Sequence, residues 1–168
     1  LHTNSAVGAF PRLIDLGIDS RMIGSSTNLV LAQRLVRKLC EQCKKKREPT
    51  AHEKELLHSF LAHTAAAAAI EKPFFVHDAV GCEKCGGSGF RGRIGVHEGI
   101  RVDGAVESAV IADPREDNIL QAAAPQGIPN MQQDGLMKAL DGITPLAELT
   151  RVVDLYGEKG IHRPSQDL

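Results

Sequence analysis

The segment "GCEKCGGSGFRGRIGVHE", residues 81–98, places two cysteines three positions apart and follows them with a run of glycines and arginines. A second cysteine pair with the same spacing opens the upstream segment "CEQCKKKR", residues 40–47. Two residues between thiolates let one tight turn present both sulfurs to a single ion, and two such turns complete a closed tetrahedral site. We therefore predict one structural Zn2+ ion, bound by Cys40, Cys43, Cys82 and Cys85.

The surroundings of the two cysteine pairs leave a few alternatives open. The thiols could instead form two redox disulfides or stay unrelated, but the sequence shows no charged start followed by an apolar stretch, as a secretion signal would. Gly81, Gly86 and Gly87 are expected to help the backbone turn and to donate amide hydrogen bonds to the sulfurs. His77 could replace one cysteine, but all four thiols already have partners, so we interpret it as a surface histidine.

The composition bounds the class of protein. The 168 residues are 42% hydrophobic and 4% aromatic, and the formal net charge is -1. A chain with this net charge does not attract nucleic acid through its overall charge. So few aromatic residues also disfavour a surface on which the bases of single-stranded nucleic acid stack. No apolar run approaches the roughly 18–20 residues that span a bilayer. We expect a soluble, cytosolic chain that is part of a longer protein.

Helical signals dominate the rest of the sequence. Between the cysteine pairs, Thr50 with Glu53 forms a capping box, an alanine run covers residues 65–69, and Pro73 ends the pattern. Ile94 and Val96 among glycines predict a short β-hairpin packed on the metal site. Further helices are expected over about residues 4–18, with Pro11 kinking or restarting the helix, and over about 20–40, 113–123, 130–140 and 144–155. The chain is therefore expected to be mostly α with a small β element.

A basic cluster overlaps the first cysteine pair. Its members are Arg34, Arg37, Lys38, Lys44, Lys45, Lys46 and Arg47, with Glu41 as the only acidic residue among them. A solvated face that helps keep the thiolates deprotonated is the simplest interpretation. Contact with anionic lipid headgroups or a partner protein, and binding of nucleic acid, are the two alternatives. Arg91 and Arg93 could pair with Glu98 or with a neighbouring subunit, although packing support is the simpler role.

Together the motifs resemble one family, the hexameric ATPases that drive type II secretion and type IV pilus assembly, in their C-terminal part. The matching segments are "LHTNSAVGAFPRLIDLGID", "LAQRLVRKLCEQC", "GCEKCGGSGFRGRIGVHE" and "QDGLMKALDGITPLAELTRVV", in this order. The resemblance implies the end of a RecA-like P-loop ATPase domain over residues 1–39 and a zinc-binding subdomain with a helical insert over 40–100. A C-terminal helical subdomain over 101–156 and a tail over 157–168 complete the expected organisation.

The resemblance also implies which parts of the ATPase this chain carries. His2 corresponds to the family's histidine box near the terminal phosphate, although in the isolated chain we interpret it as an exposed terminal histidine. No Gly-Lys pair occurs in the sequence, so the loop that cradles phosphates in such ATPases is missing. ATP and Mg2+ are therefore expected only in the longer parent, and this chain alone should be inactive. The implied partners are neighbouring subunits of a homohexamer and the platform and adaptor proteins of the bacterial inner membrane, at its cytoplasmic side.

Two other functions share some of these motifs. A zinc-ribbon module that binds nucleic acid would carry similar cysteine pairs and lysines, but it rarely needs long helical segments on both sides. A chaperone-type cysteine-rich domain repeats C-x-x-C-x-G-x-G, which "CEKCGGSG" satisfies. The first pair, "CEQCKKKR", lacks those glycines, and the chaperone module needs four such repeats. Both remain alternatives to the secretion ATPase.

Overall fold

The computed structural model describes residues 3–62, 64 and 66–155, and the chain divides into two compact units. Unit 1 comprises residues 1–33 and 97–131, and unit 2 comprises 34–96 and 132–168. Each unit therefore combines two segments that lie far apart in the sequence. The subdomains expected to end at residues 39, 100 and 156 are instead consecutive in the sequence, and these boundaries stay a prediction.

Unit 1 is a cluster of four short helices. They are α1 (Ala9–Asp15), α2 (Ser20–Ser26), α5 (Gly104–Ala112) and α6 (Glu116–Ala123). The side chains of Asp19 and Asp103 cap α2 and α5 by accepting hydrogen bonds from first-turn backbone N–H groups, as short helices require. The buried residues that hold the helices together are Ala6, Val7, Phe10, Ile23, Ile100, Val106, Val110 and Ile119. Helix α5 was not expected, because its valines and its starting glycine are weak helix formers, and the Asp103 cap was the available signal.

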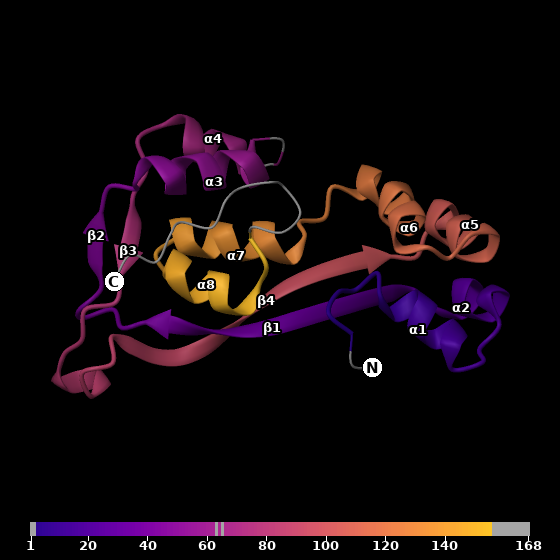
Figure 1. Cartoon of the computed structure of the whole chain (residues 1–168), viewed down its shortest axis with the longest axis horizontal. Helices are drawn as coiled ribbons and strands as arrows, with labels where there is room; N and C mark the ends of the chain where they lie inside the picture. The colour runs from indigo at the N-terminus through magenta and orange to yellow at the C-terminus, as the bar shows by residue number, and fades with distance from the viewer. Residues whose placement is uncertain (1–2, 63, 65, 156–168) are drawn as a thin grey trace. The chain divides into compact units, whose positions relative to one another are not determined.

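Two long strands replace elements that the sequence predicts differently. Strand β1 (Leu29–Leu39) pairs with β4 (Phe90–Arg101), and the two run side by side in opposite directions (Figure 1). The helix expected over residues 20–40 is therefore wrong beyond Ser26. Leu31, Leu35 and Leu39 recur every four residues, a spacing that places side chains on one face of a helix and also on one face of a strand. The apolar spacing alone could not decide between the two.

The β-hairpin expected within residues 90–100 is also wrong. Residues 90–101 form one continuous strand, and their partner is β1, about fifty residues earlier in the chain. Gly92 has a positive φ of 81° but does not interrupt the strand. The β-branched residues correctly predicted strand, while the choice of partner depended on the distant segment that was expected to be helical.

Unit 2 surrounds the cysteine pairs with helices and a second small sheet. Its helices are α3 (Ala51–Leu61), α4 (Ala67–Glu71), α7 (Met131–Leu140) and α8 (Leu146–Val152). Strands β2 (Lys45–Arg47) and β3 (Val76–Asp78) pair antiparallel, with Lys46 opposite His77. The predicted capping box is confirmed, since the Thr50 side chain accepts from the Glu53 N–H and the Glu53 carboxylate accepts from the Thr50 N–H.

The single helix expected between the cysteine pairs is instead two. Helix α3 ends at Leu61, and α4 ends at Glu71, two residues before Pro73, as the proline predicts. Ala65, at the start of the predicted alanine run, lies outside the described residues. The predicted downstream helices are confirmed as α6, α7 and α8.

An ion pair between the half-exposed Arg37 and the buried Glu148 joins the two segments of unit 2. The Glu148 carboxylate on α8 is 7% exposed and accepts from Arg37 Nε at 2.9 Å and from Arg37 Nη2 at 2.5 Å. The Arg37 guanidinium also stacks on the Phe90 ring, 4.0 Å from its centroid. The hydrogen bonds hold the pKa of Glu148 below its ordinary value, with burial opposing them. Strand β1 is thereby tied to α8 across more than a hundred residues of sequence.

Helices make up 46% of the described residues and the sheets are small, so the expected mostly α chain with a small β element is right in outline. Within the described residues, no helix combines the length and the apolar character needed to cross a membrane.

Candidate metal centre

Two tight turns of unit 2 bring the four cysteines together. The first follows the end of β1, where the Cys43 N–H donates to the Cys40 carbonyl at 3.2 Å. The second is a short 3-10 turn, Glu83–Cys85, in which the Cys85 N–H donates to the Cys82 carbonyl at 3.2 Å. Each turn presents two sulfurs on one side, as the spacing of the cysteines predicts.

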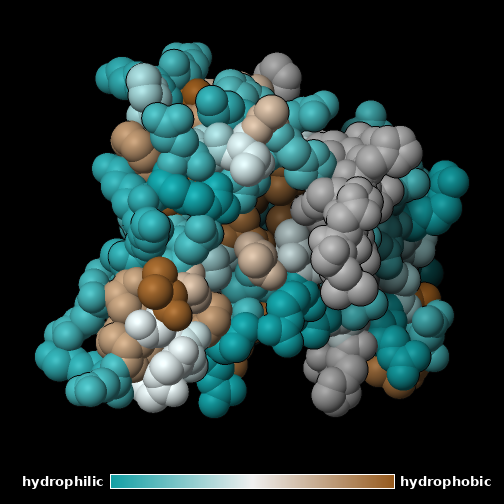
Figure 2. All heavy atoms as spheres, turned by 60° about the vertical axis from the view of Figure 1, so that its left-hand side comes forward, coloured by the Kyte–Doolittle hydropathy of each residue, from teal (hydrophilic) through white to brown (hydrophobic). Residues whose placement is uncertain are grey.

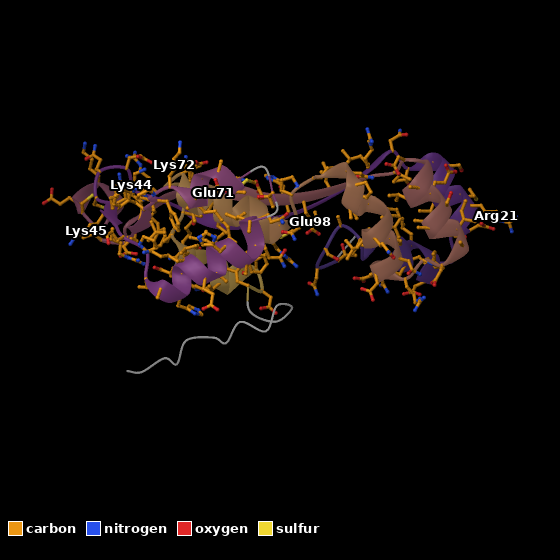
Figure 3. The ribbon with its side chains drawn as sticks, turned by 90° about the horizontal axis from the view of Figure 1, so that it is seen from above. Arg21, Lys44, Lys45, Glu71, Lys72 and Glu98 are labelled. Atoms are coloured by element: carbon orange, nitrogen blue, oxygen red, sulfur yellow. The ribbon has the colours of Figure 1, made fainter. Side chains whose placement is uncertain are left out.

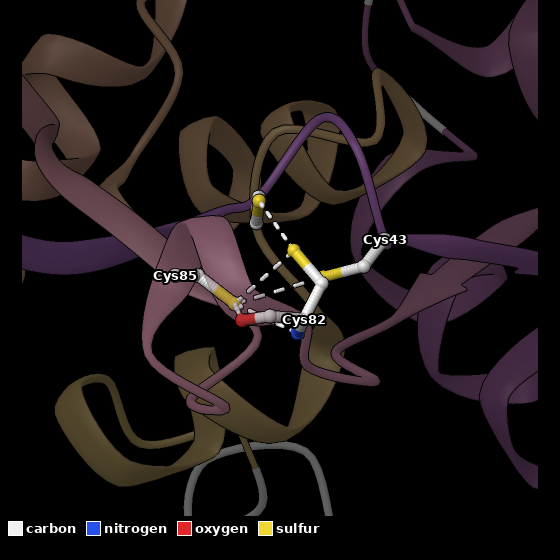
Figure 4. Close-up of side chains that lie close together, drawn as sticks. Cys43, Cys82 and Cys85 are labelled. Atoms are coloured by element: carbon white, nitrogen blue, oxygen red, sulfur yellow. Dashed lines mark hydrogen bonds between the residues drawn. The ribbon is translucent and has the colours of Figure 1, made fainter.

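The four sulfur atoms have the separation that a tetrahedral metal site requires. The Sγ–Sγ distances are 3.9 Å from Cys40 to Cys82, 3.8 Å from Cys43 to Cys85 and 3.7 Å from Cys82 to Cys85, and all four atoms lie within 4.8 Å of one another. Four sulfurs placed about 2.3 Å from a central Zn2+ would be about 3.8 Å apart. The three labelled side chains converge in Figure 4. The thiols are free, so the four cysteines fit one metal ion and not two disulfides.

Backbone groups support the sulfurs through hydrogen bonds. Cys85 Sγ accepts from the N–H groups of Cys82 at 3.1 Å and Gly89 at 3.2 Å, and Cys43 Sγ accepts from the Gly81 N–H. The predicted donor role is therefore right for Gly81. Gly86 and Gly87 donate instead to the carbonyls of the turn itself. They still help the chain turn, because both have positive φ.

Gly89 connects the two turns directly. Its carbonyl accepts from the Cys40 N–H at 2.9 Å, while its own N–H donates to Cys85 Sγ. Its φ is +75°, and a Cβ at this position would lie 2.7 Å from the Ala79 Cβ. Glycine is therefore needed here both for backbone conformation and for space.

The thiols differ in acidity. The backbone N–H groups of Cys82 and Gly89 lower the pKa of Cys85 to about 6, while burial raises the pKa of Cys43 to about 12. Four sulfurs at this spacing cannot all be thiolates without a cation, because the negative charges would repel one another. A bound divalent ion would supply the missing charge, and all four coordination positions would then be protein sulfurs.

His77 does not belong to the group of metal ligands in the described structure. It is half-buried on β3, against Gly142, so the interpretation of His77 as a surface histidine is wrong. Burial, together with the charges of Lys44 and Lys46, lowers its pKa. The neutral imidazole therefore acts as a packing group between β3 and the turn that precedes α8.

The members of the basic cluster differ in whether they form salt bridges. Arg37 pairs with Glu148 and Lys44 pairs with Glu41 at 2.8 Å. Arg47 pairs with both Glu53 at 2.7 Å and Asp78 at 2.6 Å, and its hydrogen bonds to Glu53 hold the pKa of that carboxylate below its ordinary value. Three lysines of the cluster remain exposed, namely Lys38, Lys45 and Lys46. Lys45 is labelled near the paired Lys44 in Figure 3.

Glu98 has partners other than the predicted arginines. Its carboxylate accepts from the backbone N–H of Ala6 at 2.5 Å and of Met131 at 3.3 Å, which ties three segments of unit 1 together. Arg91 and Arg93 are exposed on β4. His2 lies outside the described residues. No feature of the sequence near Glu98 indicated its role, because both donors are backbone groups far away in the chain.

Comparison with known proteins adds a family relationship. Residues 1–151 match the model of a family described as type II/IV secretion system protein. The chain is 40% identical over 152 residues to the type II secretion system ATPase E of Vibrio cholerae, covering 90% of the chain and 28% of that protein. It is 36% identical over 155 residues to the type IV pilus assembly ATPase PilB of Thermus thermophilus, and 34% identical over 152 residues to PilB of Pseudomonas aeruginosa. These alignments cover 92% and 90% of the chain but only 17% and 25% of the two relatives.

Proposed function

The chain belongs to the type II/IV secretion system protein family, and we propose that it is the zinc-supported C-terminal region of a hexameric ATPase that powers type II secretion or type IV pilus assembly. The observation that carries this proposal is the family match over residues 1–151, which covers unit 1, most of unit 2 and all four cysteines. Three curated relatives are named as ATPases of these two machines. The chain spans 17–28% of their lengths, so the activity of the whole protein belongs to the proposal.

Zinc is the proposed metal because the ligand set is four thiolates at tetrahedral spacing. Cys40, Cys43, Cys82 and Cys85 would hold it. A site closed by four protein ligands leaves no position for water, so the ion would contribute structure and no catalytic chemistry. Its role would be to keep β1, the second turn and β4 in fixed relation, and so to stiffen unit 2.

Residues 1–39 are proposed to be the end of a RecA-like domain whose phosphate-binding loop lies in the longer parent. His2 would contribute to that domain as its histidine-box residue, and ATP and Mg2+ would bind only in the parent. The proposed subdomains are residues 1–39, 40–100 and 101–156, followed by a tail over 157–168. The chain by itself is proposed to be inactive, because its sequence contains no Gly-Lys pair.

The proposed setting is the cytoplasmic face of the bacterial inner membrane, with neighbouring subunits and the platform and adaptor proteins of the machine as partners. Anionic phospholipid is a further proposed contact, through the exposed Lys38, Lys45 and Lys46. Each lysine near an anionic leaflet contributes about 1 kcal/mol, so three would bias docking without anchoring the protein. Because Arg37, Lys44 and Arg47 form salt bridges within the chain, the basic cluster would attract lipid less strongly than seven unpaired cations would.

The test uses both this chain and a longer polypeptide in which the phosphate-loop portion of the same protein precedes it. The longer protein should hydrolyse ATP, and Cys82→Ser should lower both its metal content and its hydrolysis rate. The chain alone should show no saturable binding in a nucleotide titration. Micromolar ATP binding by the chain alone, or full hydrolysis by a metal-free Cys82→Ser parent, would contradict the proposal.

A further inference from the structure

The edge of strand β1 that faces away from β4 is covered where β1 belongs to unit 2. There the Leu39 N–H donates to the Ile143 carbonyl at 2.8 Å. The Arg37 carbonyl accepts from the Thr144 hydroxyl at 2.9 Å. The segment before α8 thus satisfies outward backbone groups of β1, as a neighbouring strand would.

In unit 1 the same edge of β1 has no such partner. Just before the strand, the Asn28 carbonyl accepts from the Val102 N–H, directly after β4, at 2.9 Å. Backbone groups alternate in direction along an antiparallel strand, so residues 30 and 32 point toward β4, and residues 29, 31 and 33 point away from it. Within the described part of the chain, this sheet has no third strand, and no hydrogen bond reaches the outward groups of Leu29, Leu31 or Gln33.

Strand β4 shows how unit 1 covers an edge with its own residues. The side-chain amide of Gln126 accepts from the Arg101 N–H at 3.1 Å and donates to the Arg101 carbonyl at 2.7 Å. Residues 29–33 of β1, "LVLAQ", also contain no charged residue or proline, the residue types with which proteins commonly prevent an edge strand from pairing. This part of β1 is therefore a template for a further strand.

The side chains on this part of β1 are apolar on both faces. Leu29 is 50% exposed and Leu31 is 67% exposed. They share one face of the sheet, because a Cβ on Gly99 of β4 would lie 3.0 Å from a Leu31 methyl carbon and 3.9 Å from one of Leu29. Val30 and Ala32, on the other face, pack against the hydrophobic core of unit 1. Strands that are apolar on both faces are typical of sheets covered on both sides.

Exposed apolar side chains are concentrated in unit 1. Eight of the eleven large hydrophobic residues that are exposed in the described structure belong to it, although it is the smaller unit. The face of the molecule drawn in Figure 2, by comparison, is mostly hydrophilic, and its hydrophobic residues form small patches. Unit 1 therefore has apolar surface that a further part of a protein can bury.

We infer that the free edge of β1 at residues 29–33 pairs with an uncharged, apolar β-strand from the part of the parent polypeptide outside this chain. That parent belongs to the proposed function, on which this choice of occupant rests. The chain spans 17–28% of the lengths of three curated relatives, so the parent would hold more sequence outside the chain than within it. Backbone hydrogen bonds would fix the added strand, and its side chains would cover Leu29 and Leu31. An acidic or basic strand would find no charge to pair with on this edge.

Amide hydrogen exchange, resolved to single residues, tests the pairing. In the chain alone, the N–H groups of Leu29, Leu31 and Gln33 should exchange rapidly, whereas Val30 and Ala32 are protected by β4. In the longer polypeptide that includes the phosphate-loop portion, the three outward N–H groups should exchange at least about 100-fold more slowly. Equal exchange in the two proteins would overturn the inference. Protection in the chain alone that rises with its concentration would also overturn it, because a second copy would then occupy the edge.

ATP hydrolysis by the longer polypeptide, measured in parallel, separates this inference from the proposed function. Hydrolysis without protection of residues 29, 31 and 33 would refute the added strand and leave the ATPase assignment intact. Protection of these residues without hydrolysis would support the added strand and count against the ATPase assignment.

Proline substitutions distinguish the two edges of β1. Gln33→Pro removes only an outward N–H, so the chain alone should keep its urea midpoint, while the longer polypeptide loses protection at residues 29 and 31. Ala32→Pro, the matched control, removes an N–H directed at β4 and should destabilise both proteins. Leu31→Lys should leave the chain alone folded and raise exchange at residues 29 and 33 of the longer polypeptide by about tenfold or more. Equal destabilisation of the chain alone by Gln33→Pro and Ala32→Pro would show that the edge is not free and refute the inference.

Discussion

Replacing Gly89 by alanine should weaken metal binding far more than the same change at Gly86. Both glycines have positive φ, +75° and +60°, where a Cβ costs about 1–2 kcal/mol. At Gly86 the new methyl group would meet no atom within 4 Å. At Gly89 it would lie 2.7 Å from the Ala79 Cβ and 3.1 Å from the Ala79 Cα and carbonyl carbon, so backbone must move.

The extra cost at Gly89 follows from overpacking, which typically destabilises by about 1–3 kcal/mol. Any such movement disturbs the Gly89 N–H that reaches Cys85 Sγ and the Gly89 carbonyl that accepts from the Cys40 N–H. Because metal binding and folding of such turns are coupled, this cost should appear in metal affinity. We expect Gly89→Ala to bind zinc about 5- to 150-fold more weakly than Gly86→Ala.

The assay is a zinc titration against a chromophoric chelator at neutral pH, with thiol counting to confirm that the four cysteines are reduced. Gly86→Ala is the matched control, because it changes the same residue type at a similar φ within the same turn. Equal zinc affinity of Gly89→Ala and Gly86→Ala would refute the reasoning that Gly89 couples the two cysteine turns. Such a result would mean that the second turn can shift away from Ala79 without disturbing the sulfurs.

Three further predictions concern other parts of unit 2. Glu148→Gln should destabilise the chain by about 1–3 kcal/mol at pH 7, because Arg37 loses a charged acceptor. Because the pKa of Glu148 is lower in the folded state, its charge stabilises the fold above the ordinary glutamate pKa, and this stabilisation is lost as the pH falls through the folded-state pKa. The urea unfolding midpoints of the native chain and of Glu148→Gln should therefore converge in acid. A difference between the two midpoints that stays constant with pH would contradict this. Chelation of the metal at neutral pH should increase amide hydrogen exchange over the two cysteine turns and β4 more than over α5 of unit 1. An equal increase in exchange throughout the chain would argue against a metal that stabilises structure locally. Changing Lys45 and Lys46 together to Glu should reduce binding to vesicles that contain phosphatidylglycerol at low salt, and unchanged co-sedimentation would assign these lysines to a solvated surface.

The cysteine cluster and the start of α3 were predictable because they depend on short stretches of chain. Two residues between cysteines determine whether one turn can present both sulfurs, and the structure places all four within 4.8 Å of one another. The Thr50–Glu53 capping box likewise closes within four residues and is present as predicted. The family motifs are local segments too, which is why their order along the chain already indicated the family that the comparison shows.

Features that depend on a distant partner could not be obtained in this way. Leucines spaced by four fit a helix and a strand equally, and only the pairing of β1 with β4 decided that residues 29–39 are extended. The basic cluster looked continuous in sequence, yet Arg37 and Arg47 are neutralised by Glu148 and Asp78, which follow them by 111 and 31 residues. The sequence by itself thus determined the grouping of the four cysteines, the capping box of α3 and the family, because local geometry suffices for these. The tertiary structure alone decided which segments are strands and which arginines of the basic cluster are paired, because both depend on contacts between residues that the chain keeps far apart.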